Sequence, residues 1–254
     1  MLIEQTLMGD IDKVAISVDR IKSFEPLDGY YLAFSGGKDS VVLKALTLMA
    51  GVKFDAHYSV TTIDPPELVR FIRSNHPDVI WERPAKPFLS RLVEKGFPLR
   101  KQRWCCSEFK EKGGHGRFVL TGIRKAESFK RSSRKMIETC FKDLSKKYLN
   151  PIFDWSDAEV WEFIRGHNIP YCSLYDEGFK RIGCVMCPMN YWRKREAERW
   201  PGFKHSFLLA FRKLYERAKE RPSFQRWKSG DEVFEWWLGK NNYREGTDQG
   251  VLFE

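Results

Sequence analysis

The chain of 254 residues is long enough to bury a full hydrophobic core, so it does not need its six cysteines as disulfides. No apolar stretch reaches the length of about 18 residues that a membrane-spanning helix requires, and residues 1–13 lack the apolar run of a signal peptide. We therefore expect neither a membrane span nor a secretory leader. We expect a cytoplasmic protein whose cysteines serve metal ligation or thiol chemistry.

The net charge of +10 is unevenly distributed along the chain. Residues 100–135 hold twelve Lys and Arg against three acidic residues, and residues 193–228 hold twelve against four, so the remainder is net acidic. Charge alone does not name an anion. Both stretches are interpreted either as solvated surfaces or as sites for a polyanion, that is, nucleotide phosphates or nucleic acid.

Short apolar runs alternate with segments of helical periodicity over the first half of the chain. Strands are predicted at residues 30–34, 53–60, 79–81 and 117–121, and helices at 40–50, 67–75 and 87–95. This alternation predicts an α/β fold in which a parallel twisted sheet has helices on both faces. Ligands of such sheets bind beyond the carboxyl ends of the strands. Ser35 and Gly122 both lie at such ends.

The pattern changes after residue 150. Ser156 is the predicted N-cap of a helix over residues 157–167, and Glu159 completes its capping box. Residues 168–190 are rich in Gly, Pro and Cys and are predicted to be irregular. We expect a domain to end at residue 190, followed by a small helical extension over 191–254 that is basic, rich in Trp and ends in a loosely held tail from Tyr243.

The first predicted strand leads into the loop Ser35-Gly36-Gly37-Lys38-Asp39-Ser40, which a helix follows. Glycines allow backbone N–H groups to approach phosphate oxygens closely, and the helix N-terminus adds a favourable dipole. Lys38 supplies a positive charge, Ser35 and Ser40 supply hydroxyls, and Asp39 orients the loop or a magnesium ion. The loop therefore predicts a phosphate-binding site.

This loop is not the P-loop of GTPases and kinases. That motif requires glycine where this chain has Leu32, and Ser or Thr where it has Asp39. The loop instead matches the SGGxDS signature of the PP-loop ATP pyrophosphatases, which cleave ATP between its α- and β-phosphates. A chance glycine turn does not account for six residues in this order between a strand and a helix. Residues 1–190 are therefore predicted to form a PP-loop nucleotide-binding domain.

Four cysteines form a second motif, Cys105-Cys106 and Cys184-Val-Met-Cys187. Two such pairs supply the ligands of a [4Fe–4S] cluster or of a structural zinc ion. Adjacent cysteines are unusual for zinc, whose paired ligands are commonly about two to four residues apart. The alternative is four ordinary core cysteines. Cys140 and Cys172 lie outside the pattern and are interpreted as packing residues.

These motifs resemble the PAPS reductase (phosphoadenylyl-sulfate reductase) family over residues 28–190. The two cysteine pairs resemble the cluster motif of adenylyl-sulfate reductases. Residues 122–128, with the sequence GIRKAES, resemble the arginine-bearing turn at the family's nucleotide site. Residues 150–155 and 171–184 continue the match. The resemblance implies an adenine nucleotide alpha hydrolase-like fold with the cluster beside the nucleotide site.

Two departures indicate which branch of the family this chain resembles. Adenylyl-sulfate reductases attack the sulfate with a cysteine near their C-terminus, and no cysteine follows Cys187 here. Their phosphate loop is degenerate, because their substrates lack the β- and γ-phosphates of ATP. The loop here is intact, as in the sulfate adenylyltransferase small subunit and the DNA phosphorothioation ATP pyrophosphatases. The latter combine such a loop with a cluster and resemble this chain best.

The resemblance implies an ATP pyrophosphatase that uses Mg²⁺ and releases pyrophosphate, leaving AMP or an adenylylated acceptor for sulfur transfer. Arg124, which follows Gly122, would stabilise charge at the α-phosphate, and Asp39 would position the loop or the metal. Asp64 either binds the ribose hydroxyls or merely starts a helix. The residues expected to hold the leaving pyrophosphate are Gly36, Gly37, Lys38 and Ser40.

Two other functions are compatible with these sequence features. One is a phosphoadenylyl-sulfate or adenylyl-sulfate reductase that uses an external thiol, and the other is a nucleotide-switched subunit that binds nucleic acid. The tryptophans after residue 191 are interpreted either as stacking platforms for single strands or as packing anchors. Expected partners are ATP, DNA or other nucleic acid, and a cysteine desulfurase or other modification subunits.

Overall fold

The computed structural model describes residues 2–6 and 9–239, so the tail predicted from Tyr243 lies outside the described residues. The chain divides into two compact units. The first is built from residues 1–59, 66–82 and 112–182, and the second from residues 60–65, 83–111 and 183–254. The second unit thus takes segments from both sides of residue 190. Within the described ranges, no helix is long and apolar enough to cross a membrane.

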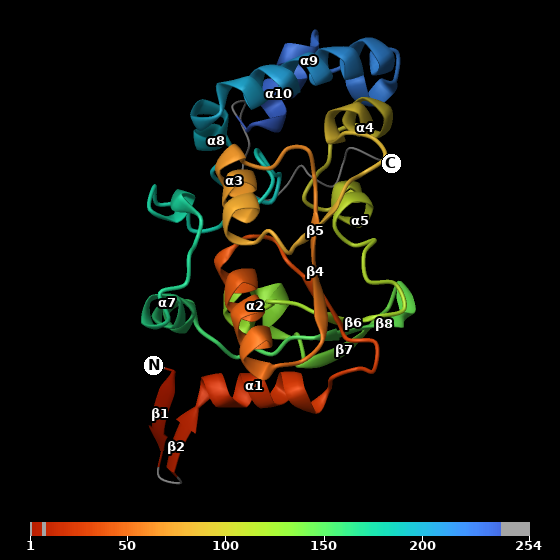
Figure 1. The fold of residues 1–254 in the computed structure, drawn as a ribbon. Helices are drawn as coiled ribbons and strands as arrows, with labels where there is room; N and C mark the ends of the chain where they lie inside the picture. Colours follow the sequence, from red (N-terminus) through yellow and green to blue (C-terminus); the bar gives the residue numbers. More distant parts are fainter. Residues whose placement is uncertain (1, 7–8, 240–254) are drawn as a thin grey trace. The chain divides into compact units, whose positions relative to one another are not determined.

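The first unit is organised around a six-stranded sheet with the strand order β5-β4-β3-β6-β8-β7 (Figure 1). Every pair in it is parallel except β7 and β8, which are antiparallel. The predicted α/β fold is therefore confirmed, although the parallel strand β8 and the antiparallel edge strand β7 were not predicted. The strands are β3 (Tyr30–Ala33), β4 (Phe54–Ser59), β5 (Ile80–Glu82), β6 (Phe118–Leu120), β7 (Ile137–Cys140) and β8 (Asp143–Leu149).

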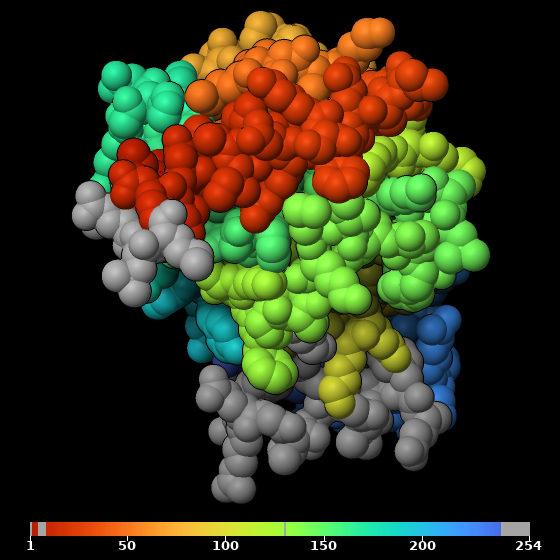
Figure 2. Space-filling view, turned by 90° about the horizontal axis from the view of Figure 1, so that it is seen from below, coloured from red at the N-terminus to blue at the C-terminus, as the bar shows by residue number. Residues whose placement is uncertain are grey.

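Helices and one hairpin complete the first unit. The Asp12 side chain caps α1 by accepting from the N–H groups of Val14 and Ala15, and α7 has the predicted capping box of Ser156 and Glu159. Figure 2 shows the N-terminal segment, in red, on one face of this unit. These elements are β1 (Ile3–Thr6), β2 (Gly9–Asp12), α1 (Lys13–Ser23), α2 (Lys38–Ala50), α3 (Pro66–Asn75), α6 (Phe129–Ser132) and α7 (Asp157–Gly166), with 3₁₀ turns at Lys125–Glu127 and Ser173–Tyr175.

The second unit is helical and has an aromatic core. Phe97 contacts the rings of Phe211, Phe224, Trp227 and Trp236. Trp200, Trp227 and Trp237 are buried, so their interpretation as packing anchors is confirmed, whereas Trp192 is exposed. The helices are α4 (Phe88–Lys95), α5 (Trp104–Phe109), α8 (Arg193–Arg199), α9 (Pro201–Ala218) and α10 (Gly230–Trp237), with a 3₁₀ turn at Pro222–Phe224.

A buried histidine supports α2 from the side of α3. His76 packs edge-on against Phe34 and Phe71, and its Nδ1 lies 3.3 Å from the ammonium group of Lys44. Lys44 in turn forms an ion pair with Asp78 at 2.6 Å. Burial, followed by the charge of Lys44, lowers the pKa of His76 to about 4. His76 is therefore neutral in the folded protein near neutral pH.

This shift predicts a loss of stability in acid. Between the ordinary histidine pKa of 6.5 and about 4, the unfolded chain binds a proton at His76 that the folded chain does not bind. The free energy of unfolding therefore falls as the pH is lowered through this range. A His76→Asn variant keeps an acceptor for Lys44 but does not titrate, so its slope should be shallower. Denaturant unfolding at a series of pH values measures both slopes, and equal slopes would contradict the prediction.

Candidate functional site

The loop between β3 and α2 has, at one position, a backbone conformation that favours glycine. Gly36 has φ +70°, and a Cβ atom there would lie 2.7 Å from the side chain of Leu68 and 2.8 Å from that of Ile72. Gly122, at the end of β6, is equally confined, because its Cβ would lie 2.9 Å from the main-chain oxygen of Asp39. Gly122 thus allows the end of β6 to contact the start of α2, and Gly36 allows the loop to lie against α3.

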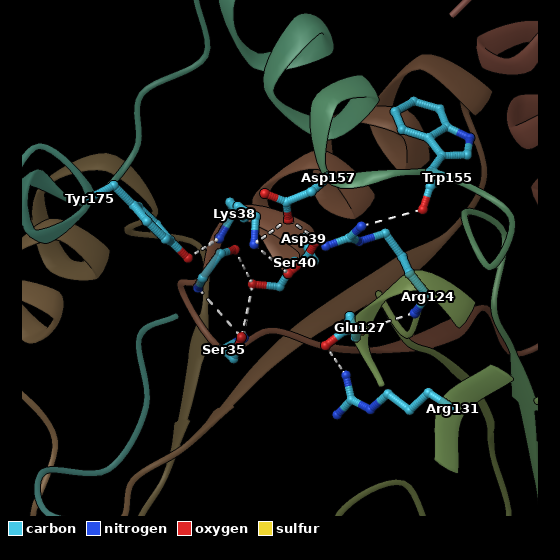
Figure 3. A network of polar contacts seen from close by, with 11 residues as sticks. Ser35, Lys38, Asp39, Ser40, Arg124, Glu127, Arg131, Trp155, Asp157 and Tyr175 are labelled. Carbon is cyan, nitrogen blue, oxygen red and sulfur yellow. Dashed lines mark hydrogen bonds and ion pairs between the residues drawn. The ribbon is translucent and has the colours of Figure 1, made fainter. Parts of the chain in front are cut away.

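The two serines of the loop hold its backbone. The Ser40 hydroxyl donates to the carbonyl of Gly37 at 2.9 Å and accepts from the N–H of Ser35 at 3.2 Å. The hydroxyls of Ser35 and Ser40 lie 3.1 Å apart, and the N–H of Gly37 donates to Ser35 at 3.4 Å. Figure 3 shows these contacts at the start of α2. Both serines therefore shape the loop.

The predicted cations converge on two carboxylates. Arg124 is 2% exposed; its Nε lies 2.6 Å from Asp39, and its terminal nitrogens contact Asp157 at 3.0 Å and the carbonyl of Trp155 at 3.3 Å. Lys38 Nζ lies 3.1 Å from Asp157 and 3.6 Å from Asp39. The structure thus brings Lys38, Asp39 and Arg124 together, as predicted. It adds Asp157, whose single oxygen Oδ1 bridges both cations (Figure 3).

The charges of this network act on Asp157. Burial alone would raise its pKa, but the hydrogen bond from Lys38 and the charges of Lys38 and Arg124 hold the pKa below its ordinary value. Asp157 is therefore ionised near neutral pH. The sequence offered no signal for this role, because an acidic residue just after an N-cap is a common feature of a helix start.

A tyrosine completes the environment of the loop. The N–H of Lys38, in the first turn of α2, donates to the hydroxyl of Tyr175 at 2.9 Å. Burial raises the pKa of Tyr175, so the hydroxyl stays protonated. Since its oxygen accepts from Lys38, its proton can be donated to an oxygen placed at the helix N-terminus. Tyr175 lies in the stretch that carries the family resemblance, but no role followed from its position in the sequence.

The turn that carries Arg124 is held by Glu127. The N–H of Arg124 donates to the Glu127 carboxylate at 3.0 Å, and Arg131 forms an ion pair with the same side chain (Figure 3). Lys125 lies over the ring of Phe153 at 4.5 Å. Lys125 and Arg131 thus have other partners, and Arg124 alone of these three basic residues contacts Asp39 and Asp157.

The second unit contains the four predicted cysteine ligands. Cys105 and Cys106 lie on α5, and Cys184 and Cys187 flank a turn in which the N–H of Cys187 donates to the carbonyl of Cys184 at 3.2 Å. The hydrogen bond between the two adjacent thiols lowers the pKa of Cys106 to about 6 and raises that of Cys105. The charges of Cys187 and Cys184 also raise the pKa of Cys105, so the two pairs interact electrostatically.

Within the part of the chain that the structure describes, the four thiols do not form a site for a metal ion. Among the described residues, no group of three or more His, Cys, Asp or Glu side chains could hold such an ion. Four thiols are the donor set of an iron–sulfur cluster as well as of a zinc ion, so the cluster stays a prediction. Because the thiols and the loop at residues 35–40 belong to different units, their expected proximity stays a prediction.

A buried carboxylate supports the turn between Cys184 and Cys187. Glu196 is 4% exposed and accepts from the N–H of Met186 at 2.7 Å and from the side chain of Asn190 at 2.5 Å. Met186 has φ +55°, so this hydrogen bond holds the turn in a left-handed conformation. Burial raises the pKa of Glu196 to about 7.

Asp64 also belongs to the second unit. Its two carboxylate oxygens accept from the N–H and the hydroxyl of Thr61, at 2.8 and 2.7 Å. These contacts give Asp64 a local role in shaping the chain before α3. Ribose binding by Asp64 stays a prediction. Of the other cysteines, Cys172 is fully buried, as expected of a packing residue, and Cys140 is half-buried on the edge strand.

A family model described as the phosphoadenosine phosphosulfate reductase domain matches residues 29–190. The chain belongs to this family. The family membership inferred from the motifs is therefore confirmed. The crystal structure of phosphoadenylyl-sulfate reductase from Candida auris in a phosphate complex is similar, with a TM-score of 0.51 over 66% of this chain and 87% of that chain. At 18% identity this likeness shows the fold alone.

Several known proteins are similar in sequence to this chain over part of their length. An uncharacterised protein of Methanocaldococcus jannaschii is 36% identical over 173 residues, which are 62% of this chain and 35% of that protein. Adenosine 5′-phosphosulfate reductase of Neisseria meningitidis serogroup A is 41% identical over 83 residues, 32% of this chain and 34% of that protein. The enzyme of the same name from Allochromatium vinosum is 34% identical over 122 residues, 44% of either chain. The chain thus spans about a third to a half of the curated relatives it matches.

The packing of the loop predicts the effect of adding one methyl group. Gly36→Ala places a residue with a side chain at φ +70°, which costs roughly 1–2 kcal/mol, and adds the clash with Leu68 and Ile72. Gly51→Ala, at φ +68° with nothing within 4 Å of the added Cβ, is the matched control. Denaturant unfolding should show the larger loss of stability for Gly36→Ala. Equal losses would mean that the loop does not pack against α3 as described.

Proposed function

We propose that this member of the phosphoadenosine phosphosulfate reductase family is an ATP pyrophosphatase. ATP would bind with Mg²⁺ at residues 35–40, the α-phosphate would be attacked, and pyrophosphate would leave. The observation that carries the proposal is the convergence of Lys38, at the N-terminus of α2, and Arg124 on one carboxylate oxygen of Asp157. Two buried cations and a helix N-terminus form a site for more than one phosphate.

In this proposal, different residues of the site would contact the leaving pyrophosphate and the α-phosphate. The backbone N–H groups of Gly36 and Gly37, the charge of Lys38 and the hydroxyl of Ser40 would hold the leaving pyrophosphate. Arg124, held in place by Asp39 and the carbonyl of Trp155, would stabilise the charge that develops at the α-phosphate. Mg²⁺ is commonly bound by one or two carboxylates together with substrate phosphates, and Asp39 would supply a carboxylate here.

The group that would accept the adenylyl moiety is proposed from the resemblance of the loop and the cysteines to those of the family. The product would be AMP, or an adenylylated acceptor from which AMP leaves when sulfur attacks. We include in the proposal DNA as an acceptor and a cysteine desulfurase as the source of sulfur, because the chain resembles the DNA phosphorothioation branch best. The basic stretches at 100–135 and 193–228 are compatible with a polyanionic acceptor.

A second candidate is reduction of adenylyl sulfate or phosphoadenylyl sulfate by an external dithiol. The relatives named as adenosine 5′-phosphosulfate reductases favour it. The dithiol would become a disulfide, and sulfite and the adenosine nucleotide would leave. Both candidates place an adenosine α-phosphate near Arg124, so the products are what distinguishes them.

The four thiols support an iron–sulfur cluster as part of the proposal. Cys105, Cys106, Cys184 and Cys187 would each bind one iron of a [4Fe–4S] cluster. With all four irons bound by protein, the cluster would supply structure and charge to the second unit. Glu196 would hold the turn between the second pair in the conformation that binds iron.

Product analysis tests the pyrophosphatase. Incubation with ATP and Mg²⁺ should yield AMP and pyrophosphate, separated by chromatography. Lys38→Ala should reduce turnover by about 100-fold or more, since it removes a charge that acts on the phosphates. Lys22→Ala, an exposed lysine of α1, is the control and should be unaffected. ADP and phosphate as products would contradict the proposal, and sulfite release from a sulfonucleotide without ATP cleavage would favour the second candidate.

Metal analysis tests the cluster. Anaerobic purification should give a brown protein with about four irons and four sulfides per chain. A Cys184→Ser/Cys187→Ser variant should lose the colour and the iron, whereas Cys140→Ser should keep both. A colourless protein with one zinc per chain would assign the thiols to zinc. A metal-free protein with full activity would leave them as packing residues.

A further inference from the structure

Asp157 occupies an unusual position among the charges of the first unit. Its Oδ1 lies 3.1 Å from the ammonium nitrogen of Lys38 and 3.0 Å from a terminal nitrogen of Arg124. One oxygen therefore accepts from both cations, as a phosphate oxygen bound between them would. The site that binds phosphate in the proposed function already contains an anion that belongs to the protein.

The burial of these three groups differs sharply. The side chains of Lys38 and Arg124 are 7% and 2% exposed, whereas that of Asp157 is 64% exposed. The cations are fixed within the unit, while the carboxylate reaches them from the solvent side. Asp157 is the first residue of α7 after its N-cap Ser156, so its side chain can rotate towards water without any change in the helix.

A second anion cannot join Asp157 at the same point. Two like charges within hydrogen-bond distance strongly disfavour each other, so a phosphate oxygen and the carboxylate compete for Lys38 and Arg124. Asp39 also contacts Arg124 at 2.6 Å and Lys38 at 3.6 Å, but its side chain is 23% exposed against 64% for Asp157, so Asp157 is the carboxylate that can leave more readily. Binding of phosphate is therefore an exchange in which one carboxylate leaves.

We propose that Asp157 acts as an internal competitor for the phosphate site and is displaced when the nucleotide binds. This inference rests on the proposed function, because it takes Lys38 and Arg124 as phosphate-binding groups. Without a ligand, Asp157 neutralises two buried cations and preserves the shape of the loop. To displace Asp157, a ligand has to offer Lys38 and Arg124 more negative charge than a single carboxylate offers. This requirement favours polyphosphates over singly charged anions. Asp157 is thus a residue that determines specificity.

Binding of pyrophosphate to the full-length chain in EDTA tests this proposal by calorimetry. Asp157→Asn removes the competing charge and should tighten pyrophosphate binding by about tenfold or more, as expected when one charge-assisted contact no longer has to be broken. The matched control is Asp154→Asn, which removes the same charge three residues earlier, where Asp154 pairs with Arg20 at 2.8 Å. The control should leave the affinity unchanged. Asp157→Ser is a second variant, should the amide fold poorly.

The outcomes separate this inference from the proposed function. Tighter binding by Asp157→Asn, but not by Asp154→Asn, supports displacement, because a merely structural role for Asp157 predicts weaker binding. Unchanged or weaker binding by Asp157→Asn overturns it. If the unmodified chain and Lys38→Ala fail alike to bind pyrophosphate and ATP, the proposed function fails as well.

Discussion

The ion-pair network of Arg124, Lys38, Asp39 and Asp157 is the constraint on which the first unit depends. Two cations that are almost fully buried, Lys38 and Arg124, lie at the end of the sheet. Burying either charge without a carboxylate partner would lower the stability of the folded protein. Asp39 and Asp157 supply the partners from the starts of two different helices, α2 and α7. The network therefore ties β6, α2 and α7 together at the edge where ligands of parallel sheets bind.

Close packing around the network allows it to form. Gly122 lets the end of β6 approach the main chain of Asp39, and Gly36 lets the loop lie against α3. Tyr175 then contacts the first turn of α2 through its hydroxyl. Backbone N–H groups, two buried cations and a protonated tyrosine consequently gather at one helix N-terminus. This combination is suited to phosphates, and the chemistry performed on them depends on which nucleotide is bound.

The second unit contains a separate set of reactive groups. Its thiols lie on a six-residue helix and on a left-handed turn, and a core of Phe and Trp rings fills the remaining helices. Glu196 connects these parts, since it lies on α8 and binds the turn at Met186. Burial raises the pKa of this carboxylate to about 7, and the N–H of Met186 and the amide of Asn190 help to offset the cost of burying its charged form.

The sequence by itself determined the α/β fold, the position of the loop at residues 35–40 and the two cysteine motifs, because these depend on local periodicity and on short motifs. It did not predict the hairpin of β1 and β2, the helices α1, α5 and α6, or the strands β7 and β8, whose segments are short or rich in polar residues. Contacts between distant segments were decided only by the tertiary structure. From the sequence, Asp157 is predicted only to begin a helix, and Tyr175 only to lie in an irregular segment. They join Lys38 because the sheet brings α2, α7 and the Ser173–Tyr175 turn together, and no spacing along the chain encodes that approach.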